Sequence, residues 1–203
     1  MAAEIKGGLQ WLWREPRLRA TSLLLTGSDF ALNALYLVLV VTAREDGFSA
    51  TEIGVMLGIV GASGMIGALW APWLSRRTSF SGVVIGVQVL TAALVPLLLT
   101  TSNTYARGVI YGAVIAAWPT WNASVRSYQF AVTPDPLQGR VQSVSLLLSN
   151  GAVPLAPFFA GLLLALVGPN LTLIAFSALL GVVAAAAASS RAIRSVSHED
   201  SPP

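Results

Sequence analysis

The chain has 203 residues, of which 55% are hydrophobic and only 10% are charged. A soluble domain carries about 25% charged residues, so this composition indicates a membrane protein and leaves no room for a sizeable soluble domain. The absence of cysteine excludes disulfides and thiolate chemistry.

Apolar runs long enough to cross a bilayer core of about 30 Å follow a short amphipathic segment. Residues 1–18 mix Trp11, Leu12 and Trp13 with basic residues, which predicts an interfacial lead-in helix. Residues 19–188 form the predicted transmembrane domain, and residues 189–203 form a polar tail. The six predicted spans cover about residues 20–43, 53–74, 82–99, 108–131, 141–167 and 171–188. The expected fold class is therefore an all-α integral membrane protein.

Lysine and arginine residues gather on one side of these spans. The turns on that side hold nine of them and the turns on the other side hold two, Arg44 and Arg107, whereas Arg126 lies inside a span. The positive-inside rule then places both termini in the cytoplasm. Because topology accounts for most of the basic excess, we expect the lipid bilayer, and no nucleic acid, as the partner of these charges.

The predicted spans divide into two triplets, which must be inverted relative to each other because each holds an odd number of helices. Inverted three-helix repeats are typical of secondary transporters. Within the second span, glycines recur every three or four residues, which indicates close helix packing: Gly54, Gly58, Gly61, Gly64 and Gly67. Gln88 and Asn150 are single amides in apolar runs and are typical of hydrogen bonds between membrane helices.

One carboxylate lies deep inside the first span. Asp29 is roughly 15 Å from the start of that span at about 1.5 Å per residue, and Asn33 and Tyr36 continue a polar stripe at i+4 and i+7. A charge at the bilayer centre costs roughly 2.5 to 3.5 kcal/mol, so such residues normally face a cavity or a partner. Asp29 is therefore a candidate proton or cation site. The alternative is a structural ion pair or a hydrogen bond between helices.

The fourth span carries a matching stripe of Trp118, Asn122 and Arg126, with Trp121 beside it. Arg126 lies close to the cytoplasmic end of its span, so its side chain can either pair with Asp29 or extend to the lipid headgroups. The two stripes together are the candidate lining of a substrate and proton path: Asp29, Asn33, Tyr36, Trp118, Trp121, Asn122 and Arg126.

Sequence motifs for catalysis are absent. The chain has no HExxH, no GxSxG before a helix and no P-loop, and its single histidine, His198, lies in the tail. An intramembrane hydrolase needs paired acids or a Ser/His set at one depth, and Asp29 is the sole acid in the middle of a span. We therefore expect no enzymatic activity, no cofactor and no metal site.

Three stretches resemble a known family: EIKGGLQWLWREPRLR at residues 4–19, GFSATEIGVMLGIVGASGMIGALWAPWLSRR at residues 47–77, and TPDPLQGRVQSV at residues 133–144. Together they resemble the C-terminal half, helices seven to twelve, of a major facilitator superfamily transporter. The similar branch is that of bacterial enterobactin, macrolide and multidrug exporters. The resemblance implies that Asp135, Gly139 and Arg140 form a cytoplasmic loop motif that holds neighbouring helix ends. The loop after the second span departs from the family pattern, because it lacks the acidic residue of the signature loop and has Arg76 and Arg77 there.

The same resemblance implies a half-length efflux transporter in the bacterial inner membrane. It would move a small amphipathic compound, such as a drug or a siderophore, outward by alternating access with proton coupling. Because the family encloses its cavity with twelve helices, the expected partner is a second six-helix half or a second copy of the chain. The alternative is a non-transporting truncated fragment or a membrane assembly or regulatory subunit.

Overall fold

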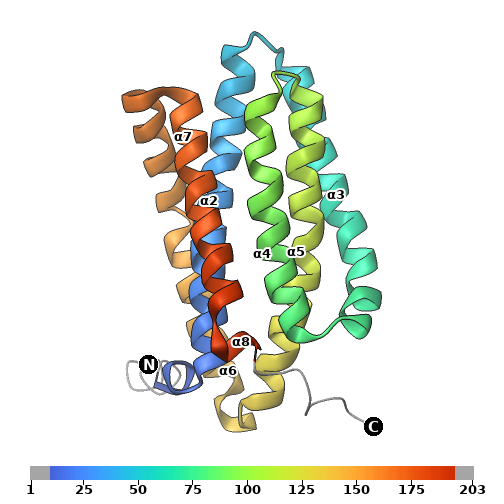
Figure 1. Cartoon of the computed structure of the whole chain (residues 1–203), viewed down its shortest axis with the longest axis vertical. Helices are drawn as coiled ribbons and strands as arrows, with labels where there is room; N and C mark the ends of the chain where they lie inside the picture. The colour runs from blue at the N-terminus through green and yellow to red at the C-terminus, as the bar shows by residue number, and fades with distance from the viewer. Residues whose placement is uncertain (1–9, 195–203) are drawn as a thin grey trace.

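The computed structural model describes residues 10–194, except for the side chains of residues 136 and 148–150. The long helices are α2 (Pro16–Glu45), α3 (Ala50–Arg77), α4 (Phe80–Leu94), α5 (Thr104–Val132) and α7 (Leu155–Ser189). Shorter elements complete this part of the chain: η1 (Val95–Thr100), α6 (Asp135–Ala152), α8 (Arg191–Arg194) and a helical turn at residues 10–14. The helices form one elongated bundle in which the chain reverses direction from each long helix to the next (Figure 1).

Local sequence signals explain where the first helices begin. Pro16 occupies the first turn of α2, where its missing N–H group costs no hydrogen bond. Ser49 and Glu52 form a capping box at the start of α3. Asn103 caps α5, since its Oδ1 accepts hydrogen bonds from the backbone N–H groups of Tyr105 and Ala106 at 2.9 and 3.0 Å. The helices α2, α3, α4 with η1, and α5 cover the first four predicted spans.

The region of the last two predicted spans is organised differently. The run 141–167 is interrupted, because α6 ends at Ala152 and α7 begins at Leu155, after Pro154. Proline cannot donate a backbone hydrogen bond and clashes with the preceding turn of a helix. At Gly168 the backbone φ is 78°, a left-handed conformation that glycine adopts without strain. The element α7 therefore consists of two helices that fold back on each other at Gly168 (Figure 1).

Four segments of the described chain are long and apolar enough to cross a membrane: Pro16–Glu45, Ala50–Arg77, Phe80–Thr100 and Leu155–Ser189. The helix α5 has 29 residues, which is long enough at about 1.5 Å per residue, but polar side chains along it lower its hydropathy. The protein is thus an integral membrane protein, and the part of its chain that the structure describes is all-helical.

Two closely packed helix pairs build the bundle. The helix α3 lies against α5, α2 lies against α7, and α4 contacts both pairs. The contact between α3 and α5 is closest at Gly67, where an added Cβ would lie 2.0 Å from the carbonyl oxygen of Ala116. On α5, Gly108 faces Met56 and Gly112 faces Ser63. Glycine thus allows these two backbones to approach each other.

Only some of the recurring glycines of α3, for which the sequence predicts close helix packing, take part in this contact. Gly64 and Gly67 contact α5, whereas a Cβ added at Gly54, Gly58 or Gly61 would meet no atom within 4 Å. The spacing explains the difference, because a step of three residues rotates by about 60° around a helix of 3.6 residues per turn. The row of glycines therefore winds away from α5 and does not form one flat face.

Buried polar contacts join the helices. The Ser28 hydroxyl of α2 donates a 3.0 Å hydrogen bond to Oε1 of Gln88 on α4, and both residues are completely buried. The predicted interhelical hydrogen bond of Gln88 is thus confirmed. The side chain of Asn150, for which the same was predicted, lies outside the described residues.

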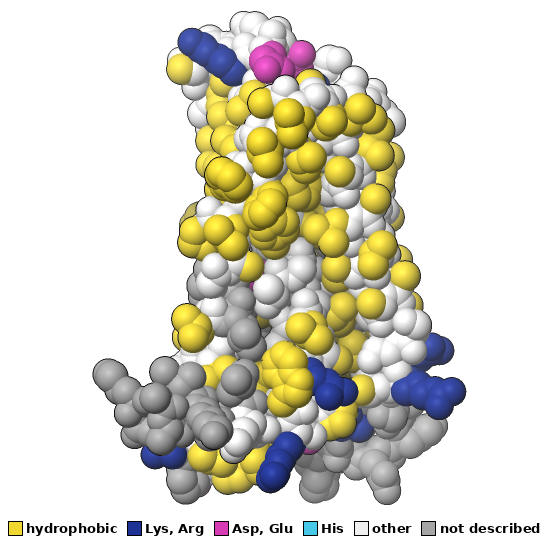
Figure 2. Space-filling model, turned by 90° about the vertical axis from the view of Figure 1, so that its left-hand side faces the viewer, with side chains coloured by type: hydrophobic (Ala, Val, Ile, Leu, Met, Phe, Trp, Pro, Cys, Tyr) yellow, Lys and Arg dark blue, Asp and Glu magenta, His cyan; other side chains and the backbone are white. Residues whose placement is uncertain are grey.

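The start of α2 and the segment α8 lie at the same end of the bundle, where Nε of Arg17 donates to the carbonyl oxygen of Ala192 at 3.2 Å. Basic side chains gather toward this end, and acidic side chains are visible at the opposite end (Figure 2). Apolar side chains cover much of the upper half of the same face (Figure 2). Most of the predicted lead-in, residues 1–9, and most of the predicted tail, residues 195–203 with His198, lie outside the described residues.

Candidate functional site

The polar stripe of α2 runs along a side of the helix that the described chain leaves partly uncovered. Asp29 is half-buried, Asn33 is exposed and Tyr36 is 44% exposed. Nδ2 of Asn33 donates a 2.8 Å hydrogen bond to the backbone oxygen of Asp29 one turn earlier. This bond occupies an amide hydrogen locally and leaves the Asp29 carboxylate available for groups on other helices.

Trp118 connects this stripe to α5. Its indole lies near enough to interact with the Asp29 carboxylate, and its ring stacks on that of Trp121, with centroids 5.5 Å apart and an interplanar angle of 6°. Close by, the hydroxyl of Tyr111 on α5 donates a 2.8 Å hydrogen bond to the backbone oxygen of Leu32 on α2. Trp118 is thus the residue of the α5 stripe that lies next to Asp29.

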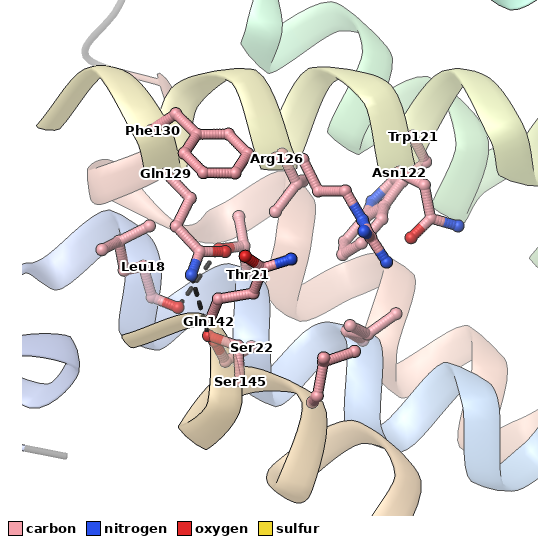
Figure 3. Close-up of a pocket in the computed structure, with 13 residues that line it drawn as sticks. Leu18, Thr21, Ser22, Trp121, Asn122, Arg126, Gln129, Phe130, Gln142 and Ser145 are labelled. Carbon is pink, nitrogen blue, oxygen red and sulfur yellow. Dashed lines mark hydrogen bonds between the residues drawn. The ribbon is translucent and has the colours of Figure 1, made fainter. Parts of the chain in front are cut away.

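A groove opens between α2, α5 and α6, toward the end of the bundle that carries α8 (Figure 3). Its walls are largely apolar, and its enclosed space is about 50 Å³. Nε2 of Gln129 donates a 3.3 Å hydrogen bond to Oγ of Ser145 and joins α5 to α6 across the groove. The polar lining residues are Thr21, Ser22, Asn122, Arg126, Gln129, Gln142 and Ser145.

The predicted path residues separate into two groups in the structure. Asn122 and Arg126 line the groove, and the fully buried ring of Trp121 lies directly behind its wall, whereas Asp29, Asn33 and Tyr36 do not border the groove. Trp118, which contacts both Asp29 and Trp121, lies between the two groups.

Two side chains on α5, those of Trp121 and Arg126, have other surroundings than their spacing predicts. Trp121 has no exposed surface and packs in an apolar cluster with Leu24 and Val84. Its Nε1 is buried and has no hydrogen-bond partner among the described residues. Arg126 is exposed and forms no ion pair with Asp29, so the suggested Asp29–Arg126 pair is not present in this structure. The carboxylate interacts with Trp118 instead.

The residues of the predicted cytoplasmic loop motif lie at the beginning of α6. Oδ1 of Asp135 accepts a 3.0 Å hydrogen bond from Nε2 of Gln138, which also donates to the backbone oxygen of Thr133 at 3.3 Å. Asp135 therefore stabilises its own turn. Gly139 and Arg140 are exposed, and the role of this motif in holding neighbouring helix ends stays a prediction.

Polar contacts at both ends of α2 and α5 were not foreseen. At one end, Arg107 donates to Asp46 at 2.8 Å. At the other end, the Tyr128 hydroxyl donates to Oε1 of Glu15 at 3.2 Å and accepts from Arg17 at 3.3 Å. The opposite charges of Asp46 and Arg107, in turns predicted on the same side of the membrane, were a usable signal for the first contact. No comparable pattern marks the second.

The Arg107 end also holds a polar cavity of about 330 Å³, lined by charged and hydroxyl groups that include Glu45, Asp46, Thr42 and Ser102. Across the described residues, no three His, Cys, Asp or Glu side chains are grouped to bind a metal ion. The chemistry that the site offers is therefore that of one intramembrane carboxylate, one arginine and several amides and aromatic rings.

Comparison with known proteins gives two matches. The sequence model of a family described as transmembrane secretion effectors matches residues 14–203. The multidrug efflux pump Tap of Mycolicibacterium fortuitum is 32% identical over 197 residues, which cover 90% of this chain and 45% of that protein. The chain thus spans less than half the length of this curated relative. No solved structure matches the chain.

Proposed function

The chain belongs to the transmembrane secretion effector family of the major facilitator superfamily, a family of transporters, and we propose that it works as one half of an efflux transporter. The cargo is a small amphipathic compound, such as a drug or a siderophore. It moves outward by alternating access, and proton entry supplies the driving force. In this proposal the chain crosses the bacterial inner membrane six times as two inverted three-helix repeats, with both termini in the cytoplasm.

The observation that carries the proposal is the position of Asp29. It lies near the middle of α2 (Pro16–Glu45), an apolar helix of membrane-spanning length, and interacts with the indole of Trp118 on α5. An intramembrane carboxylate that is half-buried and not neutralised by an arginine is suited to gain and lose a proton. Because its partner is an aromatic side chain next to the groove, a change in its charge alters the contact between the two helices that line the cargo path.

The incomplete cover of the polar stripe supports the proposal of a partner. Asn33 and Tyr36 are exposed, and polar groups exposed to lipid within a membrane are costly. A second six-helix half, or a second copy of the chain, would cover them and enclose the path. A non-transporting fragment or an assembly subunit remains the alternative that experiment has to separate from this one.

The six-crossing topology is testable with single cysteines, because the chain has none of its own. Ser102→Cys and Asn170→Cys should react with a membrane-impermeant maleimide added to intact cells. Thr78→Cys and Ser190→Cys should react only after the inner membrane is permeabilised. Labelling of Ser190→Cys in intact cells would show that α7 crosses the membrane once, and the proposed topology would then be wrong.

The transport function is tested on the chain purified from its own membranes in mild detergent, with any polypeptide that accompanies it. The complex is reconstituted into liposomes, and the flux of fluorescent cationic and anionic amphiphiles is measured with and without an imposed pH gradient. Asp29→Asn should abolish the dependence on the gradient, whereas Glu45→Gln, which removes an exposed carboxylate from the end of the same helix, should preserve it.

Two results would count against the proposal. Unchanged flux and gradient dependence in Asp29→Asn would remove the proton role of this residue. A lone monomer without any flux, obtained from native membranes, would favour the non-transporting alternative.

A further inference from the structure

The groove between α2, α5 and α6 has an unbalanced charge. Arg126 contributes a guanidinium group to its wall, and none of the lining residues is an aspartate or glutamate. Arg126 has no ion-pair partner in the part of the chain that the structure describes, and Asp29 interacts with Trp118 instead. A guanidinium group in a largely apolar groove is expected to attract an anion.

Three of the six other polar lining residues donate hydrogen bonds within the protein. Nδ2 of Asn122 donates to the backbone oxygen of Trp118 at 3.3 Å. Oγ1 of Thr21 donates to the backbone oxygen of Arg17 at 2.9 Å, and Gln129 donates to Ser145. Arg126 is therefore the group that decides which ligand charge the groove prefers, and its side chain extends along the groove toward Asn122 (Figure 3).

The shape of the groove limits the size of what it can enclose. Its enclosed space of about 50 Å³ suits a carboxylate, sulfonate or phosphate group and is too small for a whole drug-sized molecule. The walls beside this space are apolar, with Leu25, Val125 and Leu146 among them. Arg126 lies about 9 Å from the end of α5 at about 1.5 Å per residue, a depth that a headgroup attached to an apolar tail can reach from the membrane surface.

We propose that this groove binds the anionic head of an amphipathic molecule. The guanidinium group of Arg126 pairs with the anionic head, and the apolar walls contact the adjoining tail. Two sources share this chemistry: an anionic phospholipid of the surrounding leaflet and an anionic amphiphile carried as cargo. The assignment to cargo rests on the proposed transport function, whereas the anion site itself does not.

The test is a binding titration with the full chain in phosphatidylcholine nanodiscs, after subtraction of the signal from empty nanodiscs. The probe is 11-(dansylamino)undecanoic acid, and its methyl ester is the matched neutral probe. Arg126→Gln should weaken binding of the acid about tenfold, as expected when a charged hydrogen-bond partner is removed, and should leave the ester unchanged. Arg126→Lys should bind the acid with intermediate affinity, because it keeps the charge and loses the planar set of donors.

Arg76→Gln is the control, because it removes an exposed arginine near the end of α3 that does not line the groove. Equal affinity of wild type and Arg126→Gln for the acid would overturn the proposal, and so would an equal loss in Arg76→Gln. Unchanged binding of the ester shows that Arg126→Gln is still folded.

A titration in nanodiscs that contain phosphatidylglycerol shows whether the natural ligand of the groove is a phospholipid or a solute. Displacement of the acid by this lipid, dependent on Arg126, assigns the site to phospholipid, and persistent binding of the acid assigns it to an anionic solute. Intact binding in a complex that shows no flux would refute the proposed transport and leave the site standing.

Discussion

The close contact between α3 and α5 at Gly67 allows a quantitative prediction of how a substitution there changes the free energy of unfolding. A Cβ at this position would lie 2.0 Å from the backbone oxygen of Ala116 and 2.7 Å from its carbonyl carbon and its Cα. An ordinary contact begins near 3.4 Å, so the clash with the oxygen is short by 1.4 Å. Because the obstacle is backbone and not the end of a flexible side chain, Gly67→Ala must push the two helices apart.

Overpacking of this kind costs about 1 to 3 kcal/mol. We expect the upper part of that range for Gly67→Ala, because separating the helices also loosens the contacts of Gly108 with Met56 and of Gly112 with Ser63. Gly61→Ala on the same helix is the matched control. No atom lies within 4 Å of its added Cβ, and alanine is favoured over glycine in a helix by up to about 1 kcal/mol. The two variants should therefore change the free energy of unfolding in opposite directions.

The assay is unfolding of the purified chain in mixed micelles, followed by circular dichroism at 222 nm as the mole fraction of sodium dodecyl sulfate rises. The midpoint should fall in Gly67→Ala and stay constant or rise in Gly61→Ala. Equal midpoints for the two variants would refute the close α3–α5 contact and the packing argument built on it.

Two further pairs of residues allow tests of single polar contacts. The side chains of the Arg107–Asp46 pair are 12% and 38% exposed, so a double-mutant cycle with alanine should give a coupling energy of about 0.2 to 1 kcal/mol. This coupling energy should decrease as the salt concentration rises from 50 to 500 mM. A coupling energy that does not change with salt would contradict the prediction. Ser28→Ala should destabilise the chain by about 1 to 3 kcal/mol, because it leaves the buried Oε1 of Gln88 unpaired, and Gln88→Leu in the Ser28→Ala background should recover part of that loss in the same unfolding assay.

The positions of the helices were largely predictable from hydropathy and from capping residues. Long apolar runs and the start signals at Pro16, Ser49 and Asn103 depend on residues close together in the chain. Residues 141–167 were predicted as one span, and the break after Ala152 was missed, because proline is also tolerated within membrane helices when neighbouring groups satisfy the freed backbone. Whether such a helix bends or ends depends on contacts with the rest of the fold.

The residues of the candidate site were easier to predict from the sequence than the contacts between them. Spacing placed Asp29 and Trp118 on polar stripes of two helices, and the structure joins them. Spacing could not show that Arg126 stays apart from Asp29, because the distance between groups on different helices depends on how the helices are rotated and shifted. It also could not show that Trp121 packs into the apolar core, since an aromatic ring suits a groove and a core equally well.

The way the helices pair explains why the polar contacts lie where they do. Glycine and apolar packing hold α3 against α5, and apolar side chains hold α2 against α7. Between these pairs, α2 and α5 are joined by polar contacts at four levels: Asp46 with Arg107, the backbone of Leu32 with Tyr111, Asp29 with Trp118, and Glu15 with Tyr128. Polar contacts are directional and can exchange partners, whereas close packing resists small displacements. A change in the charge of Asp29 would therefore act on the boundary between α2 and α5, where the two pairs can shift relative to each other while each stays packed.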